Sequence, residues 1–580
     1  MSRTFIPIVP LDAPALSRER KRQGTKGRPV LPPVLAEVQA LLGPAPYRRD
    51  LLIEYLHLIQ DRYLQLATPH LAALAQLMRL SQAEVHEVAS FYHHFDIVRE
   101  DAEGLVPAPT TLTVRVCDGL SCEMAGAADL LRQLPSLLGR EVRVIPAPCV
   151  GRCEQAPVAV VHQKPLPRAT AEAVQACVQA GQREDAPGDW LKMQDCVAQG
   201  GYRVLRDCLE GRLAVDAVLQ AMDDSGLRGL GGAGFPAGRK WKIVRAQPAP
   251  RLMAVNIDEG EPGTFKDRWL LESDPHRFLE GMLVAAWAVG VDRIVIYLRD
   301  EYHGCRQLLH AALQELRGAF EGALLPAIEL RRGAGAYICG EESAMIESIE
   351  GKRGLPRLRP PYVAEIGLFG RPTLQHNFET LYWVRQILEE GPASFASHGR
   401  HGRKGLRSFS VSGRVRLPGV KLAPAGVTLR ELVAEYCGGM ADGHELYAYL
   451  PGGASGGILP ARLADLPLDF DTLQPHGCFI GSAAVIVLSQ HDRAVDAAGQ
   501  RERAQTLAAI AAEGGEPRRA ALDDVAHPEQ RLHVVFQRRP VKQALLRDIG
   551  WPQPRHAAFA FDGFDHRRFF TANISARTAP

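Results

Sequence analysis

The sequence has no hydrophobic run long enough to cross a bilayer. Its longest apolar stretch, residues 481–488, is far shorter than the roughly 20 residues that a membrane-spanning helix needs. The N-terminus mixes Arg, Pro and Lys and lacks the continuous apolar core of a signal peptide. The net charge of +2 gives no reason to expect nucleic acid or an anionic membrane as a partner. We therefore expect a cytoplasmic protein with no direct membrane insertion and no nucleic-acid partner.

Cysteine is missing from the C-terminal part of the chain, because none of the 11 cysteines follows Cys478. Four of them instead fall close together as two pairs, Cys117 with Cys122 and Cys149 with Cys153. In a chain without an export signal, paired cysteines indicate metal binding before disulfide formation.

The chain is too long for a single core, and 580 residues suggest about three to five domains. Residues 1–32 are rich in Arg, Lys and Pro without a sustained period, which predicts a flexible arm. Residues 33–105 repeat apolar side chains at three- and four-residue steps, which predicts a bundle of three short helices. Ser81 and Glu84 have the spacing of a capping box at the start of the third helix.

The rest of the chain alternates between strand and helix patterns. Residues 108–183 predict a small α/β domain, and a Gly- and Pro-containing linker follows. Residues 190–400 predict a layered α/β domain with strands at 252–255 and 294–298, and residues 403–488 predict a compact α+β domain. Residues 491–580 have poor periodicity. The predicted fold class is multidomain α/β.

The two cysteine pairs are spaced as Cys117-x4-Cys122 and Cys149-x3-Cys153, and each pair follows a predicted strand. Four thiolates on two neighbouring loops can hold a [2Fe-2S] cluster, with one pair on each iron. A structural zinc ion also accepts four cysteines, although its pairs usually stand on tight knuckle turns. Four unrelated buried thiols are the remaining alternative.

A glycine-rich run, residues 226–236, precedes Lys240 and Trp241. Such a run lets backbone N–H groups approach a phosphate closely, and a following helix would add its positive end. Taken alone, the run is a moderate indication of a nucleotide site, and the alternative is a flexible surface loop. Polar residues directly after the strand 252–255 favour a ligand site, because α/β sheets bind ligands at the carboxyl ends of their strands. A solvated acidic turn is the alternative for that stretch.

A fourth stretch, residues 331–343, combines glycines with carboxylates, and residues 350–362 add Arg and Lys side chains suited to phosphates. The sequence offers no Ser/His/Asp arrangement and no site that needs a general base. Hydride transfer depends on ring stacking and on exclusion of water, so these absences fit redox chemistry.

Taken together, these stretches resemble the NADH-dehydrogenase flavoprotein family. That family includes the 51 kDa subunit of respiratory complex I and the diaphorase subunits of NAD-reducing hydrogenases and NAD-dependent formate dehydrogenases. The front of the chain is similar to the partner 24 kDa subunit, and the resemblance covers about residues 35 to 495. It implies a helical bundle, a thioredoxin-like [2Fe-2S] domain, a Rossmann-like domain for FMN and NAD, and a ubiquitin-like (SLBB) domain.

The resemblance also implies the site residues. Those expected to bind FMN are Gly229, Gly231, Gly232, Gly234, Lys240, Asn256, Asp258, Glu259, Gly340, Glu341, Glu342 and Asn377. Phe235 matches an aromatic residue that stacks on the nicotinamide nucleotide, and Glu261 matches a carboxylate close to it. Arg359 and Tyr362 stand where the family more often has Lys and Phe. His376 replaces the first Asn of a family pair near the flavin, and Ile243 replaces an aromatic residue of some members.

Within the family, the fusion of both parts resembles most closely the β subunit of molybdenum- or tungsten-dependent formate dehydrogenases. Residues 49–61 and 450–460 carry this resemblance. It implies a separate large subunit that holds the metal–pterin centre and further iron-sulfur clusters. A flavoprotein subunit of complex I or of an NAD-reducing hydrogenase is the alternative within the family.

The tail, residues 491–580, departs from the family. Members continue with a helical domain whose cysteines ligate a [4Fe-4S] cluster, and those ligands are absent here. The tail is therefore either an unrelated replacement or an out-of-frame translation. A different hypothesis is that the chain is not an enzyme subunit but a degenerate scaffold, which binds partners without catalytic turnover.

Overall fold

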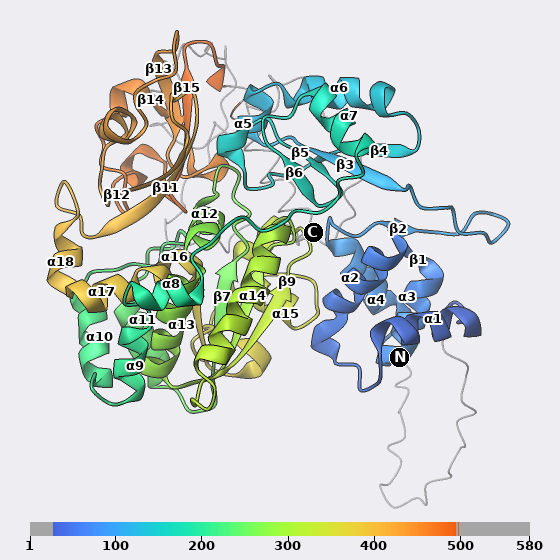
Figure 1. Ribbon diagram of the computed structural model, residues 1–580, viewed down its shortest axis with the longest axis horizontal. Helices are drawn as coiled ribbons and strands as arrows, with labels where there is room; N and C mark the ends of the chain where they lie inside the picture. The colour runs from blue at the N-terminus through green and yellow to red at the C-terminus, as the bar shows by residue number, and fades with distance from the viewer. Residues whose placement is uncertain (1–26, 495–496, 498–580) are drawn as a thin grey trace, which may run out of the picture.

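The computed structural model describes residues 27–494 and 497. Figure 1 shows the helical bundle at the lower right, below a small α/β domain, with two further sheet domains on the left. The predicted arm up to residue 26 and the tail from residue 498 lie outside the described residues. In the part of the chain that the structure describes, no helix combines the length and the hydrophobicity that crossing a membrane requires.

The N-terminal bundle has four helices rather than the three predicted: α1 Pro32–Leu42, α2 Leu52–Tyr63, α3 Thr68–Met78 and α4 Gln82–Phe91. The additional helix, α1, begins with proline at its first position, where the missing N–H costs no helical hydrogen bond. Ser81 caps α4 by accepting the Glu84 N–H at 3.1 Å. The Glu84 carboxylate pairs with Arg49 at 2.9 Å. Arg28, inside the predicted arm, is held by Gln82 and Thr68.

The second domain has a four-stranded sheet in the order β4-β3-β5-β6. Its elements are β3 Leu112–Cys117, α5 Leu120–Met124, α6 Ala127–Leu138, β4 Val142–Ala147, β5 Ala159–Val161, β6 Lys164–Leu166 and α7 Ala171–Gln179. The parallel strands β3 and β4 end side by side, because Cys117 pairs in register with Ala147. The loops that carry the two cysteine pairs therefore leave the same edge of the sheet.

The third domain contains a parallel sheet in the order β10-β7-β8-β9. Its strands are β7 Arg251–Ile257, β8 Val291–Leu298, β9 Ala327–Arg332 and β10 Thr373–Asn377. Its helices are α8 Met193–Ala198, α9 Arg203–Leu209, α10 Val215–Asp224, α11 Ala237–Arg245, α12 Lys266–Ser273, α13 Pro275–Val289, α14 His303–Ala319, α15 Glu342–Ile349, α16 Phe378–Tyr382, α17 Val384–Glu390 and α18 Pro392–Ser397.

Both faces of this parallel sheet are covered, as parallel sheets require. Met253 and Val255 point into a core shared with helices α13 and α14. Leu252 and Ala254, on the other face, share a core with the N-terminal bundle. The bundle thus covers the second face of the sheet, and the two parts share one hydrophobic core.

The last described domain has a mixed sheet in the order β12-β11-β15-β13-β14. Its elements are β11 Leu406–Gly413, β12 Gly419–Pro424, α19 Leu429–Glu431, β13 Leu446–Leu450, β14 Leu459–Pro460 and β15 Ala484–Ser489. It is an α+β domain, as predicted for this region. Short strands β1 Leu66–Ala67 and β2 Ile97–Val98 pair within the bundle domain.

Candidate functional site

The site lies where the strand order of the parallel sheet reverses. The chain proceeds from β7 outward to β8 and β9, and then returns to place β10 on the other side of β7. Ligands of open α/β sheets bind in the crevice at such a switch point. Asn256 near the end of β7 and Asn377 at the end of β10 are direct register partners there.

Asn256 ties three segments together at this point. Its Nδ2 donates to the Gly340 carbonyl at 2.8 Å, and its Oδ1 accepts the Asp258 N–H at 2.9 Å. Asn377 caps α16 by accepting the Glu379 N–H at 3.0 Å. The carboxyl end of the sheet is therefore bounded by the Gly340 turn on one side and by α16 on the other.

The glycine-rich loop lies directly over these asparagines. Its ends are joined by the Gly229 N–H, which donates to the Phe235 carbonyl at 2.8 Å. A Cβ on Gly231 would lie 2.9 Å from the Asn377 Cβ, and a Cβ on Gly234 would lie 2.7 Å from the Phe470 ring. Gly232 has φ +121°, a conformation that favours glycine. Gly231 is thus needed for the loop to approach the strand end, and Gly234 for the loop to pack against Phe470.

Charged residues surround the opening of this cradle. Lys240 on α11 donates to the Gln375 carbonyl at 3.1 Å and lies 3.6 Å from Glu342. Glu341 caps α15 by accepting the Ser343 and Ala344 N–H groups, both at 2.9 Å. Arg359 pairs with Glu341 and Glu342, which holds its loop across the start of α15. Phe235, predicted to stack on the nicotinamide nucleotide, and Tyr362, predicted to bind a cofactor, are both exposed.

Asp258, the first residue after β7, supplies a test of whether the cradle fits a polar cofactor. Its Oδ2 is buried and has no hydrogen-bond partner among the described residues. Backbone without side chains surrounds that atom, since a Cβ on Gly260 or Gly340 would lie 3.4 Å or 3.6 Å from it. Burial raises the pKa of Asp258 to about 8, so the carboxyl is mostly protonated at neutral pH. The residues present therefore fit a ligand that accepts a hydrogen bond, as an FMN ring does.

Two predicted cofactor-binding carboxylates are engaged inside the protein. Glu259 accepts the Asp267 N–H at 2.7 Å, the Arg268 N–H at 3.1 Å and the Tyr302 hydroxyl at 2.7 Å. It thereby anchors the start of α12. Glu261 accepts the backbone and hydroxyl of Ser455, both at 2.8 Å, and the Tyr337 hydroxyl. Their contacts with a cofactor stay a prediction, and their observed role is to join segments around the cradle.

The four cysteines converge as the spacing predicts. All four are buried, and the Sγ atoms of Cys149 and Cys153 are 3.4 Å apart. A Cβ on Gly119 would lie 3.3 Å from the Cys149 Cβ and 3.5 Å from the Cys117 Sγ, so no side chain fits between the loops. Hydrogen bonds from Cys117 and Cys153, with the charge of Arg299, hold the pKa of the Cys149 thiol well below its usual range.

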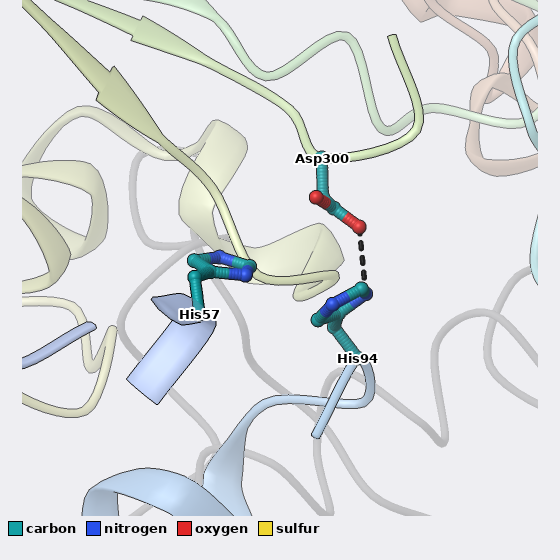
Figure 2. Close-up of side chains that lie close together, drawn as sticks. All are labelled: His57, His94 and Asp300. Carbon is teal, nitrogen blue, oxygen red and sulfur yellow. Dashed lines mark ion pairs between the residues drawn. The ribbon is translucent and has the colours of Figure 1, made fainter. Parts of the chain in front are cut away.

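A zinc ion would need all four sulfurs around one centre. Zn–S bonds of about 2.3 Å in a tetrahedron place all four sulfurs roughly 3.8 Å from one another. Among the described residues, the one group of three such ligand atoms within 4.8 Å of one another is His57, His94 and Asp300 (Figure 2). The cysteines are not in that group, and their arrangement as two pairs on neighbouring loops is the feature that fits two bridged irons.

The group in Figure 2 joins the bundle to the parallel sheet. His94 Nδ1 pairs with Asp300 Oδ2 at 2.6 Å, and Arg332 Nε donates to Asp300 Oδ1 at 2.5 Å. His57 Nε2 lies 2.9 Å from the Gly333 carbonyl oxygen, to which it donates. Both oxygens of Asp300 are therefore taken by protein donors, and the group acts as a polar link between two domains.

The iron-sulfur loop and the flavin cradle lie against each other. Arg299 directly follows β8 and donates to the Cys149 carbonyl at 2.6 Å and to the Glu259 carbonyl at 2.7 Å. Arg268 donates to the Gly151 carbonyl at 3.0 Å. Sequence reasoning missed Arg299 and Arg268, although the position of Arg299 at a strand's carboxyl end was a usable signal. It also missed the role of Lys266, which is buried between Asp267 and Glu379.

Known proteins match both halves of the chain. Residues 222–386 match the Nuo51 FMN-binding domain, and residues 38–182 match the thioredoxin-like [2Fe-2S] ferredoxin family. A subunit of the NADH-quinone oxidoreductase of Rhizobium meliloti is 43% identical over 299 residues, which are 50% of this chain and 71% of that protein. The mitochondrial NADH dehydrogenase [ubiquinone] flavoprotein 1 of Dictyostelium discoideum is 40% identical over 53% of this chain and 63% of its own length.

A solved structure extends the similarity to both halves at once. A chain of an air-oxidized NAD+-reducing [NiFe]-hydrogenase aligns with a TM-score of 0.69 and 29% identity, covering 88% of this chain and 95% of that chain. Fold, site and matches together define a flavin- and iron-sulfur-binding oxidoreductase subunit of the NADH dehydrogenase type, with FMN, NAD and [2Fe-2S] as its cofactors. The chain belongs to the NADH-quinone oxidoreductase flavoprotein family, the 51 kDa-like flavoproteins of complex I, and carries the [2Fe-2S] domain in front.

Proposed function

We propose that this chain is a diaphorase subunit that moves electrons between NAD(H) and its [2Fe-2S] cluster by way of FMN. The observation that carries the proposal is the direct contact between the two sites, where one guanidinium, that of Arg299, binds carbonyls of both Cys149 and Glu259. Electron transfer needs the two centres close together, and this contact brings the loop of one against the strand end of the other.

The residues of the cradle have distinct tasks in this proposal. FMN, when bound, exchanges a hydride with NAD(H) and single electrons with iron-sulfur clusters. The glycine loop and Lys240 would hold the cofactor, and Asn256 keeps the Gly340 turn against the strand end. Protonated Asp258, whose Oδ2 has no partner among the described residues, would donate a hydrogen bond to it. Phe235 would stack on the dinucleotide, and Tyr362 would offer a second aromatic face, since both side chains are exposed and free to meet a ligand.

The test uses the full chain reconstituted with FMN, iron and sulfide. We expect it to oxidise NADH with an artificial dye as acceptor and to show a reduced [2Fe-2S] signal by EPR after NADH is added. Cys149→Ser is the matched variant, because it removes a cluster ligand and leaves the flavin cradle intact. It should keep the dye reaction and lose the EPR signal. Failure of well-folded protein to bind FMN or to consume NADH would refute the proposal and favour a scaffold without turnover.

The partner is proposed to be the large, molybdenum- or tungsten-pterin subunit of a cytoplasmic NAD-dependent formate dehydrogenase. Residues 49–61 and 450–460 support this choice. In the structure, the two stretches contact different parts of the flavin domain. Asp50 in the first forms an ion pair with Arg331 at 2.6 Å, and Ser455 in the second donates a hydrogen bond to Glu261. Formate-dependent reduction of NAD+ by the co-purified complex is the expected result.

An NAD-reducing hydrogenase is the second candidate. The solved hydrogenase chain supports it, because the alignment spans both the iron-sulfur and the flavin parts. Hydrogen-dependent reduction of NAD+ by the same complex, without formate activity, would decide for this candidate.

A further inference from the structure

Arg299 occupies the position between the two cofactor sites. Its side chain is 5% exposed, and each of its three nitrogens has a separate acceptor. Nη2 donates to the Cys149 carbonyl and Nη1 to the Glu259 carbonyl, at 2.6 Å and 2.7 Å. Nε donates to the Glu301 carboxylate at 3.1 Å. A planar guanidinium suits this task, because its donors point in fixed directions.

The buried charge of Arg299 acts on both sites. Its guanidinium binds the Cys149 carbonyl, so a positive charge lies against the loop that carries two of the four cysteines. The same guanidinium binds the Glu259 carbonyl at the end of the flavin strand. Because the side chain is buried, water does not screen this charge from either site. The same field must stabilise any extra negative charge placed on the four cysteines.

Arg268 can be compared with Arg299, because it also binds the cysteine loop but its positive charge is balanced by carboxylates. It is 2% exposed and donates to the Gly151 carbonyl at 3.0 Å. Two carboxylates, Glu154 and Glu272, pair with it. Arg299, in contrast, has one carboxylate partner, Glu301, whose side chain is 23% exposed.

We propose that Arg299 is a positioning residue that docks the Cys149 loop on the flavin strand and raises the reduction potential of the [2Fe-2S] cluster. The inference rests on the proposed function for its purpose, since a higher potential lets the cluster accept one electron from the reduced flavin. Reduction adds one negative charge to the cluster and breaks no bond, so a nearby buried cation stabilises the reduced form.

The test is an EPR-monitored redox titration of the full chain, with dithionite as reductant and soluble mediators. Arg299→Gln should lower the equilibrium constant for cluster reduction by roughly tenfold or more, which is about 59 mV for a one-electron couple. Glu301→Gln should shift the potential upward, because it removes the counter-charge. Arg299→Lys should recover most of the shift. Replacing Arg268 and Glu272 together with Gln should change the potential by less than a third as much, because that ion pair carries no net charge.

Opposite shifts in the Arg299→Gln and Glu301→Gln proteins support the proposal. Equal potentials in all variants, or a downward shift in Glu301→Gln, overturn it. If the Arg299→Gln protein fails to assemble the cluster, the potential of the Glu301→Gln protein alone tests the proposal. That variant should fold, because the Glu301 side chain is partly solvent-exposed. Dithionite supplies the electrons, so the titration needs neither FMN nor NADH. A protein with the expected shifts but no NADH oxidation would therefore refute the proposed function and leave the role of Arg299 standing.

Discussion

Replacing Asp258 with asparagine should make the flavin domain less sensitive to pH. Asp258 is 5% exposed, its Oδ2 has no partner within the described residues, and burial raises its pKa from an ordinary 3.8 to about 8. Asparagine has nearly the same shape and cannot ionise. The substitution therefore removes the titration while leaving the packing of the cradle in place.

The sign follows from where the proton is held. Between about pH 4 and pH 8, the folded chain keeps the Asp258 proton and the unfolded chain has lost it. Because the unfolded state binds one proton fewer, the free energy of unfolding falls as pH rises, by about 1.4 kcal/mol per pH unit. From pH 5 to pH 7 this amounts to roughly 3 kcal/mol from a single carboxyl.

Urea unfolding of the FMN-free protein at pH 5, 6 and 7 measures this dependence. The free energy of unfolding of Asp258→Asn minus that of the unsubstituted chain should rise by about 1.4 kcal/mol for each pH unit. Every other titrating group is common to both proteins and cancels in the difference. A difference that stays constant across this range would show that Asp258 is not held protonated, and the reasoning would fail.

Asp492→Asn is a matched control with the opposite expectation. Although burial alone would raise its pKa, hydrogen bonds from Arg414 and Ser489 hold the pKa of Asp492 below its ordinary value of 3.8. Its contribution to stability is therefore complete above about pH 4 and is lost only as pH falls below that. The variant should lose stability by the same amount at pH 5, 6 and 7.

Three further substitutions test the geometry of the two sites. Gly231→Ala should weaken FMN binding at least roughly tenfold in a fluorescence titration, because the new Cβ would lie 2.9 Å from the Asn377 Cβ; unchanged affinity would contradict the close approach. Cys149→Ser should abolish the [2Fe-2S] absorbance, whereas Cys437→Ser, at a buried cysteine outside the set, should keep it. Glu259→Gln should lower the free energy of unfolding by about 1–3 kcal/mol, because one of the two carboxylate oxygens that accept N–H groups at the start of α12 becomes an amide nitrogen; an unchanged midpoint in urea would contradict this role.

Local patterns in the sequence were enough to predict both cofactor-binding domains. The alternation of apolar residues and the glycine run placed a ligand loop beside a strand end, and the matches to the FMN-binding and [2Fe-2S] families confirm the cofactors. Cysteine spacing predicted four convergent thiols, and the structure buries all four together. Such predictions succeed because strand ends, glycine turns and short cysteine spacings are properties of neighbouring residues.

Sequence reasoning did not find partners that lie far along the chain. The family resemblance implied a flavin contact for Glu259, which stays a prediction, but no local pattern indicated that its carboxylate accepts N–H groups of α12 and the hydroxyl of Tyr302, 43 positions away. Sequence reasoning also counted three helices in the bundle and missed α1, whose apolar pattern is short. The choice of partner for a buried carboxylate depends on which helix ends pack beside it, and packing is not a local property.

The sequence by itself determined the cofactor class, because its glycine-rich, acidic and cysteine motifs together match the FMN-binding and [2Fe-2S] families. Only the tertiary structure decided how the two sites meet. Cys149 and Arg299 are separated by 150 positions, and their hydrogen bond exists because one loop packs on the end of a distant strand. A buried guanidinium needs hydrogen-bond acceptors, and here the tertiary structure provides backbone carbonyl oxygens from distant segments.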